Sequence, residues 1–304
     1  KGQHHRAILR GHLQITCRSA EPGGKPEIAQ IDATDLVTIT QQGAALFEPP
    51  MILDPKRVAR GRLPRVSPLI VQDLNGDGRA EIIMAGCNVL YWNQGPGKFE
   101  QEELLAHAPR QLAEAAVLAD FTGDGIPDFV CSSKAEPRLQ LFVGRAGQNF
   151  AARPMVIFDD VLENPHAMTA GDVDGDGDVD LFVGQYRAPY QDGALPKPYY
   201  DANDGPPNFL LLNQGGGVFE DVTKAAGLAA RRHRRTYSAS LVDLDDDDDL
   251  DLLVVSDFSG IDLYRNDGAA QFTDVTDQWI DQRHAFAMSH TINDFNNDGR
   301  SDIY

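Results

Sequence analysis

The chain has 304 residues, a hydrophobic content of 42% and a formal net charge of −19. This length allows one or two domains, and the apolar content suffices for a continuous core. The acidity argues against nucleic acid as a partner, because phosphates are repelled by an acidic surface. No apolar run reaches about 18 residues, so the sequence predicts no membrane span. The 3 cysteines cannot all pair and lack zinc-binding spacing, and we expect Cys87 and Cys131 to be buried free thiols.

A nine-residue acidic loop occurs five times, starting at Asp73, Asp120, Asp172, Asp243 and Asp294, at intervals of 47 to 71 residues. Positions 1, 3, 5 and 9 carry oxygen-bearing side chains in every copy, and position 7 would contribute only its backbone carbonyl. Calcium fits such a set best, because it takes about six to eight oxygens at flexible geometry. We therefore expect about five calcium sites, formed by Asp73, Asn75, Asp77, Arg79 and Glu81; Asp120, Thr122, Asp124, Ile126 and Asp128; Asp172, Asp174, Asp176, Asp178 and Asp180; Asp243, Asp245, Asp247, Asp249 and Asp251; and Asp294, Asn296, Asp298, Arg300 and Asp302.

The sequence around the loops excludes an EF-hand. An EF-hand needs a glutamate at position 12 and a helix on each side, whereas position 12 is Met84, Cys131 and Val183 in the first three copies. Short apolar runs typical of buried strands follow the ninth-position acid. Position 6 is glycine except for Asp248 in the fourth copy, where a positive φ costs more, so we expect that copy to be the most strained. Solvated acidic turns without metal are the alternative, and five copies in one frame disfavour it.

Each loop is preceded by a run of small and apolar residues and is followed by a second run, a turn and a phenylalanine. One unit is therefore strand, acidic loop, strand, strand, turn, strand within about 50 residues, which is typical of a β-propeller blade. A worn sixth copy over Ser19–Glu27 lacks two carboxylates, and we expect it to bind no calcium. We predict an all-β chain in which residues 1–304 form a single β-propeller domain of five four-stranded blades and the start of a sixth. We interpret it as a fragment of a longer protein with seven blades.

The loops, together with Leu263-Tyr264-Arg265-Asn266-Asp267-Gly268 and Phe272-Thr273-Asp274-Val275-Thr276, resemble FG-GAP/VCBS repeats, the calcium-binding blades of integrin α-subunit-like propellers. The segment Phe219-Glu220-Asp221-Val222-Thr223, which leads to Ala225-Ala226-Gly227-Leu228, is similar to bacterial relatives of the cartilage acidic protein family. The resemblance covers nearly the whole chain and implies a propeller, calcium and an extracytoplasmic location (periplasm, cell surface or secreted). It implies no single activity, because such repeats serve adhesion proteins, accessory modules of toxins and enzyme appendages.

The strand order places the strand 2–3 loops and the strand 4–1 connections at the end opposite the acidic loops. The long insertion 185–208 is a strand 2–3 loop, and long ordered loops are often functional. We expect it to form a stiff aromatic ligand-binding surface; the alternative is a cover for the neighbouring blade. Its tyrosines are Tyr186, Tyr190, Tyr199 and Tyr200.

A basic run in a strand 4–1 connection falls at the same end. It either binds an anionic ligand, such as an acidic polysaccharide, or neutralises aspartates across a blade interface. The run is Arg231, Arg232, His233, Arg234 and Arg235.

The leading hypothesis is a non-enzymatic, calcium-stabilised extracytoplasmic propeller that binds a protein or a glycan through the end opposite the calcium loops. One alternative is a polysaccharide lyase or hydrolase that uses His166 or His290 near the central channel, although no catalytic constellation is visible in the sequence. The other alternative is an architectural module of a larger protein. His107 and His284 fall in strand 4–1 connections and are expected to be structural.

Overall fold

The computed structural model describes residues 4–18, 27–43, 51–53, 66–106, 113–133, 136–190 and 195–304. The chain divides into two compact units, Lys1–Asp54 and Pro55–Tyr304. In the first unit, β1 (His4–Arg10) pairs with β4 (Val37–Gly43), and β2 (Gln14–Arg18) pairs with β3 (Glu27–Asp32), all antiparallel. This nested pairing differs from the consecutive order of a blade. Residues 19–26, which hold most of the worn loop copy, lie outside the described residues, and the single propeller domain over 1–304 stays a prediction.

The second unit contains four antiparallel sheets, each built from four strands consecutive in the chain. The first two sheets comprise β5 (Leu69–Gln72), β6 (Glu81–Met84), β7 (Val89–Asn93) and β8 (Phe99–Glu103); and β9 (Ala115–Ala119), β10 (Asp128–Ser132), β11 (Leu139–Phe142) and β12 (Met155–Phe158). The next two comprise β13 (Pro165–Gly171), β14 (Asp180–Gln185), β15 (Phe209–Asn213) and β16 (Phe219–Asp221); and β17 (Thr236–Val242), β18 (Asp251–Ser256), β19 (Gly260–Arg265) and β20 (Thr273–Asp274).

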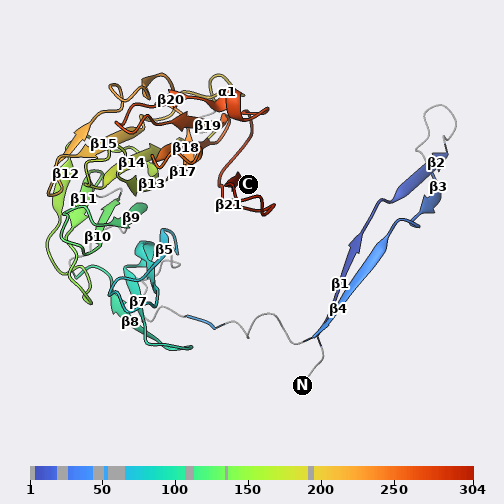
Figure 1. Ribbon diagram of the computed structural model, residues 1–304, viewed down its shortest axis with the longest axis horizontal. Helices are drawn as coiled ribbons and strands as arrows, with labels where there is room; N and C mark the ends of the chain where they lie inside the picture. The colour runs from blue at the N-terminus through green and yellow to red at the C-terminus, as the bar shows by residue number, and fades with distance from the viewer. Residues whose placement is uncertain are drawn as a thin grey trace. The chain divides into compact units, whose positions relative to one another are not determined.

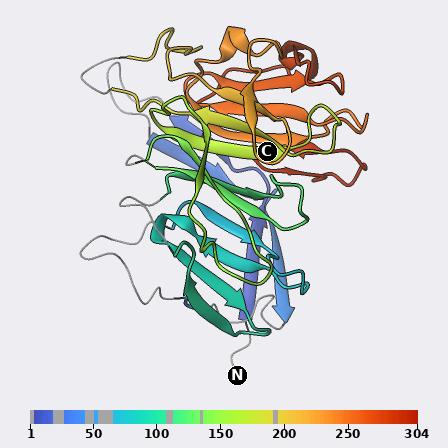
Figure 2. The same cartoon turned by 90° about the vertical axis from the view of Figure 1, so that its left-hand side faces the viewer.

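A further pair, β21 (Ile292–Asn293) and β22 (Asp302–Ile303), has the order of strands 1 and 2 of a next sheet. The short helix α1 (Thr276–Trp279) follows β20, and 3₁₀ turns lie at Ala85–Cys87 and Ala229–Arg231. Figure 1 shows the four sheets following one another around an arc, and Figure 2 shows them from the side. These sheets have the architecture of propeller blades, so the predicted all-β fold is confirmed, and they do not close a ring in the described residues.

The core lies between neighbouring sheets. All residues of β10, β14 and β18, the second strand of three sheets, are buried, which explains why these strands are nearly continuous apolar runs. One cluster joins Leu90 of the first sheet to Phe129 of the second, and later clusters join the second sheet to the third and the third to the fourth. Burying each such Leu or Phe side chain contributes about 1.5–3 kcal/mol, so each blade is stabilised mainly by its neighbours.

The consecutive strand order gives each sheet two different ends. We call the end with the strand 1–2 loops, residues 73–81, 120–128, 172–180, 243–251 and 294–302, the acidic end. The strand 2–3 loops, which include residues 186–208, and the strand 4–1 connections lie at the opposite end of the same sheets, which we call the insertion end. This arrangement agrees with the sequence prediction and separates the acidic loops from the tyrosine-rich insertion by the length of the strands.

Candidate functional site

The first aspartate of each loop is held by backbone N–H groups of its own loop. In the third loop, Asp172 accepts the N–H of Gly175 at 2.8 Å and of Gly177 at 2.9 Å. Both glycines have positive φ, +74° and +93°, which turns their N–H groups inward. The same position-1 pattern, with donors from positions 4 to 6, recurs in the other four loops.

The fourth loop reaches the same conformation without glycine. Asp246 and Asp248 have φ of +62° and +71° there, which confirms the predicted positive φ at position 6. An aspartate in the left-handed region carries a steric cost that glycine does not. The fourth loop therefore stores more backbone strain than its glycine-containing copies.

The ninth-position acid joins three strands of its sheet. Asp180 is fully buried, and it accepts the backbone N–H of Val173 at 2.9 Å and of Asn213 at 2.9 Å. These partners follow strand β13 and end strand β15, so one carboxylate fixes the start of the loop and the third strand. Equivalent pairs of bonds form at Glu81, Asp128 and Asp251. This bridge explains why an acid occupies the last loop position before each buried strand.

An asparagine at the end of strand 3 connects neighbouring sheets at the acidic end. The side-chain amide of Asn213 donates to the carbonyl of Phe121, in the loop of the preceding sheet, at 2.9 Å. The amide of Asn266 donates to the carbonyl of Val173 at 2.8 Å in the same way. This role was not predicted from the sequence, although an asparagine recurs before the strand 3–4 turn. The acidic loops therefore belong to the contact between blades.

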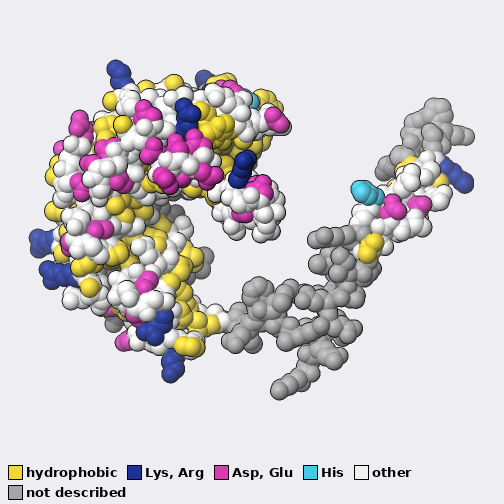
Figure 3. Space-filling model, in the orientation of Figure 1, with side chains coloured by type: hydrophobic (Ala, Val, Ile, Leu, Met, Phe, Trp, Pro, Cys, Tyr) yellow, Lys and Arg dark blue, Asp and Glu magenta, His cyan; other side chains and the backbone are white. Residues whose placement is uncertain are grey.

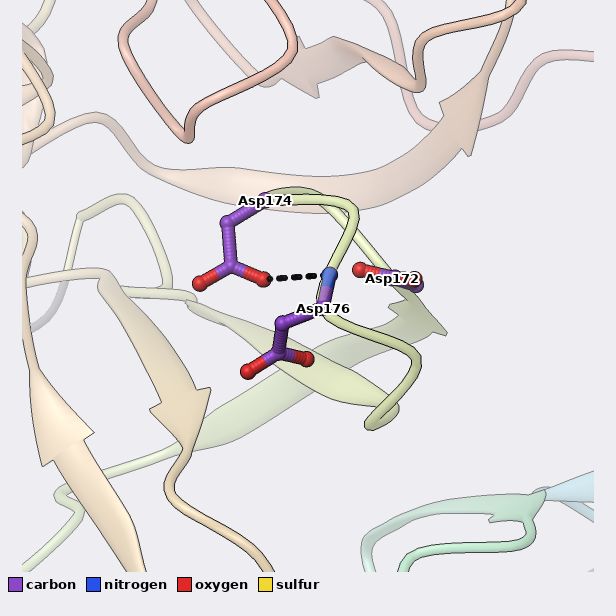
Figure 4. A group of neighbouring side chains, drawn as sticks. All are labelled: Asp172, Asp174 and Asp176. Atoms are coloured by element: carbon purple, nitrogen blue, oxygen red, sulfur yellow. Dashed lines mark hydrogen bonds between the residues drawn. The ribbon is translucent and has the colours of Figure 1, made fainter.

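Two loops bring three carboxylates together closely enough to hold a cation. In the described residues, mutual oxygen distances within 4.8 Å occur for Asp172, Asp174 and Asp176, and for Asp243, Asp245 and Asp251. Figure 4 shows the first group, in which all three side chains come from one loop and Asp174 accepts the N–H of Asp176 at 3.3 Å. The first, second and fifth loops carry Asn75, Thr122 and Asn296 at position 3, and so have one carboxylate fewer.

Burial and mutual repulsion disfavour ionisation of these carboxyls. Burial, followed by the charge of Asp176, raises the pKa of Asp174. Burial raises the pKa of Asp180 to about 6 and that of Asp251 to about 6. A bound cation would reverse this effect by favouring the charged form. The oxygen-only donor set fits a hard cation such as Ca²⁺. Figure 3 shows acidic side chains gathered over the sheets of the second unit.

The tyrosines of the insertion separate into two groups at the insertion end. Tyr186 packs against His166 and Tyr237, with ring centroids 5.4 and 4.8 Å away, and its hydroxyl donates to buried Asp257 at 3.1 Å. His166 and Tyr237 also line an open hollow of about 220 Å³ beside β9, β13 and β17. The other tyrosines, Tyr190, Tyr199 and Tyr200, lie together in a second group.

The basic run does not present its last two arginines to solvent. Arg234 and Arg235 have side chains that are only 2% exposed. Arg234 pairs with Asp262 at 3.1 Å, and Arg235 makes two hydrogen bonds to Asp204, at 2.8 and 2.9 Å. The expectation that these two residues bind an external anion is therefore corrected, because their guanidinium groups are buried in intramolecular pairs. Their contacts instead match the other interpretation of the run, in which the arginines neutralise nearby aspartates.

The rest of the run is also engaged. Arg231 lies 3.0 Å from both Asp262 and Asp274, and Arg232 lies 3.8 Å from Asp221. Arg283, outside the run, adds a third guanidinium to Asp262 at 3.1 Å. The exposed His233 has its Nδ1 3.1 Å from the carbonyl of Gly205.

His290, one of the two histidines considered for catalysis, lies at a junction between sheets. Nε2 of His290 is 2.7 Å from the hydroxyl of Ser240 in β17, and burial lowers the pKa of His290. Cys87 and Cys131 are buried and form no disulfide, as predicted, and burial raises the pKa of Cys131 to about 12. His107 lies outside the described residues, and His284 is exposed in a strand 4–1 connection. None of the helices described is long and apolar enough to span a membrane.

Comparisons with known proteins agree with this architecture. A family model described as FG-GAP-like repeat matches residues 73–131, 120–183 and 243–304. No match was found among the curated proteins. The chain is similar to a solved Agrocybe aegerita lectin structure, described as the basis of specific recognition of non-reducing terminal N-acetylglucosamine, with 20% identity and a TM-score of 0.52 over 77% of this chain and 59% of that chain. At this identity, the likeness concerns the fold.

A second solved structure, the V. cholerae biofilm matrix protein Bap1, has 17% identity and a TM-score of 0.32 over 73% of this chain and 39% of that chain. The chain thus spans less than two thirds of either solved structure. Similarity to the bacterial relatives of the cartilage acidic protein family stays a prediction.

Proposed function

Because the chain belongs to the FG-GAP-like repeat family, we propose that it is a calcium-stabilised extracytoplasmic propeller that serves as a binding or adhesion scaffold. Its ligand is a protein or a glycan, held at the insertion end. The observation that carries the calcium proposal is the convergence of Asp172, Asp174 and Asp176, with carboxylate oxygens within 4.8 Å of one another. Uncompensated carboxylates this close repel one another, and a divalent cation offsets that repulsion.

Calcium would act at the contacts between blades. The side chains at positions 1, 3, 5 and 9 and the carbonyl at position 7 would hold it, and the ion when bound supplies positive charge to a cluster of anions. Position 9 already joins strands 1, 2 and 3 through Asp180. Fixing this carboxylate as an ion ligand would stiffen the same junction. Loops of this type suit extracellular calcium, with Kd of about 10⁻⁴ to 10⁻³ M, which supports an extracytoplasmic location.

The insertion end is the better candidate for ligand binding, because the acidic end is occupied by contacts that hold the blades together. The amide of Asn213 and the carboxylate of Asp180 both serve those contacts. At the insertion end, by contrast, Tyr190 and Tyr200 are 54% and 69% exposed. Exposed aromatic side chains are favoured anchors in binding surfaces. The scaffold proposal assigns no chemistry to His166 or His290.

The third loop offers a matched pair of substitutions to test the calcium proposal. Asp176→Ala removes a position-5 ligand, whereas Asp178→Ala removes the same charge from position 7, where only the carbonyl would bind. The readout is the difference in melting temperature between calcium and excess EGTA, which separates ion binding from loop stability. We expect Asp176→Ala to reduce this difference and Asp178→Ala to preserve it. An equal reduction in both variants would reject the assigned ligand positions.

A further inference from the structure

Five aromatic rings from three separate segments meet at the insertion end. We call them the aromatic platform: Tyr190, Tyr199, Tyr200, Phe258 and Phe286. The three tyrosines come from the insertion. Phe258 comes from the β18–β19 turn, and Phe286 comes from the connection between α1 and β21. Ring centroids lie 5.0 Å apart for Tyr199 and Tyr200, and 5.1 Å apart for Phe258 and Phe286. The platform therefore combines rings from a loop of the third sheet, a turn of the fourth sheet and the connection that leads to β21.

One ring of the platform is buried in the protein, and three are largely exposed to solvent. Phe258 is 6% exposed and contacts three of the other rings, whereas Tyr190, Tyr200 and Phe286 are 54%, 69% and 56% exposed. The guanidinium carbon of buried Arg235 lies 5.9 Å from the centre of the Phe258 ring. Rings that are more than half exposed project from the surface instead of lining a closed pocket. Neighbouring rings meet edge to face, at 86° for Tyr199 and Tyr200 and at 87° for Phe258 and Phe286. The platform therefore offers several separate ring faces to an extended ligand.

The backbone beneath the platform is fixed by buried hydrogen bonds. Ala202, which follows the tyrosine pair, is fully buried and donates its N–H to the carbonyl of Phe258 at 3.2 Å. Its own carbonyl accepts the hydroxyl of Ser259 at 2.7 Å and a guanidinium N–H of Arg234 at 3.1 Å. A surface held in this way loses little conformational entropy when a ligand binds.

Polar groups are interleaved with the rings. The hydroxyls of Tyr190 and Tyr199 are 3.1 Å apart, and this hydrogen bond raises the pKa of Tyr199. Asp201, next to Tyr200, is 48% exposed and lies 3.9 Å from Nδ1 of His284, which is 52% exposed. The surface thus combines aromatic rings with their own hydroxyl groups, with the carboxylate of the neighbouring Asp201 and with the imidazole of His284, which lies beside that carboxylate.

We propose that the aromatic platform is a subsite for a neutral glycan chain with equatorial hydroxyl groups. The electron-rich ring faces attract the weakly positive C–H groups that such sugars expose on both faces, and the phenol and carboxylate groups match the hydroxyls at the sugar edges. A polyanionic glycan is disfavoured, because the buried Arg234 and Arg235 are already paired with carboxylates, and the half-exposed Asp201 is one of the partners of Arg234. This assignment rests on the proposed function, because it makes the insertion end the binding face.

A protein or a membrane is a weaker match for this surface. Hot spots in protein interfaces are side chains buried in fully desolvated pockets, whereas the platform projects outward. A membrane surface favours basic residues beside exposed apolar groups, whereas this surface carries Asp201 in a chain with a net charge of −19.

Calorimetric titration of the whole chain with cellohexaose, in calcium, tests the proposal. We expect a Kd of about 1 mM or tighter, little changed by NaCl. Tyr200→Ala and Phe286→Ala each weaken binding about tenfold, while Tyr200→Phe stays within about threefold, because the ring and not the hydroxyl stacks. Phe295→Ala removes a 53% exposed ring at the acidic end and should leave binding unchanged. A β-1,4-galactan hexamer, whose axial O4 carries each linkage and interrupts one C–H face, should bind more weakly than cellohexaose.

Equal cellohexaose binding by wild type and Tyr200→Ala would overturn the proposal, as would no binding while the calcium-dependent melting shift is retained. The latter result leaves the scaffold proposal standing with a protein partner. Loss of binding in Tyr200→Ala without any calcium-dependent shift supports the subsite and rejects the calcium role. Platform-dependent binding to phosphatidylcholine vesicles, or platform-dependent self-association in sedimentation, without glycan binding would also overturn it.

Discussion

Replacing Asp262 by Asn probes the buried charge network at the insertion end. Asp262 lies in β19, is 1% exposed, and contacts three guanidinium groups. The distances are 3.0 Å to Arg231, 3.1 Å to Arg234 and 3.1 Å to Arg283. The substitution keeps the size of the side chain but removes its charge, so any loss of stability reflects electrostatics and hydrogen bonding, with little contribution from packing.

The expected loss follows from the number of bonds that Asn cannot replace. The single amide oxygen of Asn can accept well from one of the three arginines, so two charge-assisted bonds are lost, each with a value of about 1.5–3 kcal/mol. Arg234 and Arg283 are 2% and 8% exposed and cannot turn freely to water. Breaking a buried pair costs about 3–5 kcal/mol, and we expect the same range here. For a unit of this size, the melting temperature should fall by about 10 °C.

The matched control is Asp277→Asn. Asp277 contacts the same Arg283 at 3.1 Å but is 77% exposed, and an exposed ion pair contributes only about 0–1 kcal/mol. Urea and thermal unfolding in excess calcium measure both variants against the wild type. If Asp262→Asn costs no more than Asp277→Asn, the argument that burial makes this network essential is wrong.

Three further outcomes follow from other contacts. Burial lowers the pKa of His290 below its usual 6.5, so the folded state binds fewer protons than the unfolded state, and its stability declines as the pH falls below about 6.5. The melting temperature of His290→Gln should therefore change less than that of the wild type between pH 7 and pH 5, measured in parallel scans. Asn266→Ala removes the 2.8 Å hydrogen bond from the side-chain amide to the carbonyl of Val173 and should lower the free energy of unfolding in urea by about 1–3 kcal/mol. An unchanged free energy of unfolding would show that Asn266 does not stabilise the contact between the blades. Gly260→Ala places a Cβ 1.8 Å from the carbonyl of Arg283 at a φ of +90°; it should destabilise by more than about 3 kcal/mol or prevent folding, and a wild-type melting curve would contradict the turn geometry.

The acidic loops were predictable because their signal is local. Positions such as Asp172 and Asp180 recur in one frame before apolar runs, and the loops fall between strands 1 and 2 as that pattern predicts. The left-handed conformation at Asp248 also followed from the sequence, because its four counterparts are glycine. The strand order then fixed which end carries the insertion.

Contacts between distant segments were not predictable in the same way. The platform joins Tyr199 to Phe258 and Phe286, and their separation in sequence gives no periodic signal. Burial of Arg234 depends on Asp262, which lies between Ile261 and Leu263 in β19, and the sequence does not indicate that the two residues pair. In the first unit, the pairing of β1 with β4 across the nested hairpin depends on long-range closure, which a repeat pattern does not specify.

Thermal melting in about 2 mM CaCl₂ against excess EGTA, paired with a calcium titration, tests the central claim of a metal-stabilised propeller most directly. The five loops predict a large fall in melting temperature in EGTA and binding of about five ions, and the carboxylate clusters at Asp172 and Asp243 should contribute to both. An unchanged melting temperature without calcium uptake would contradict the account, because the loops would then be acidic turns held by their own hydrogen bonds alone.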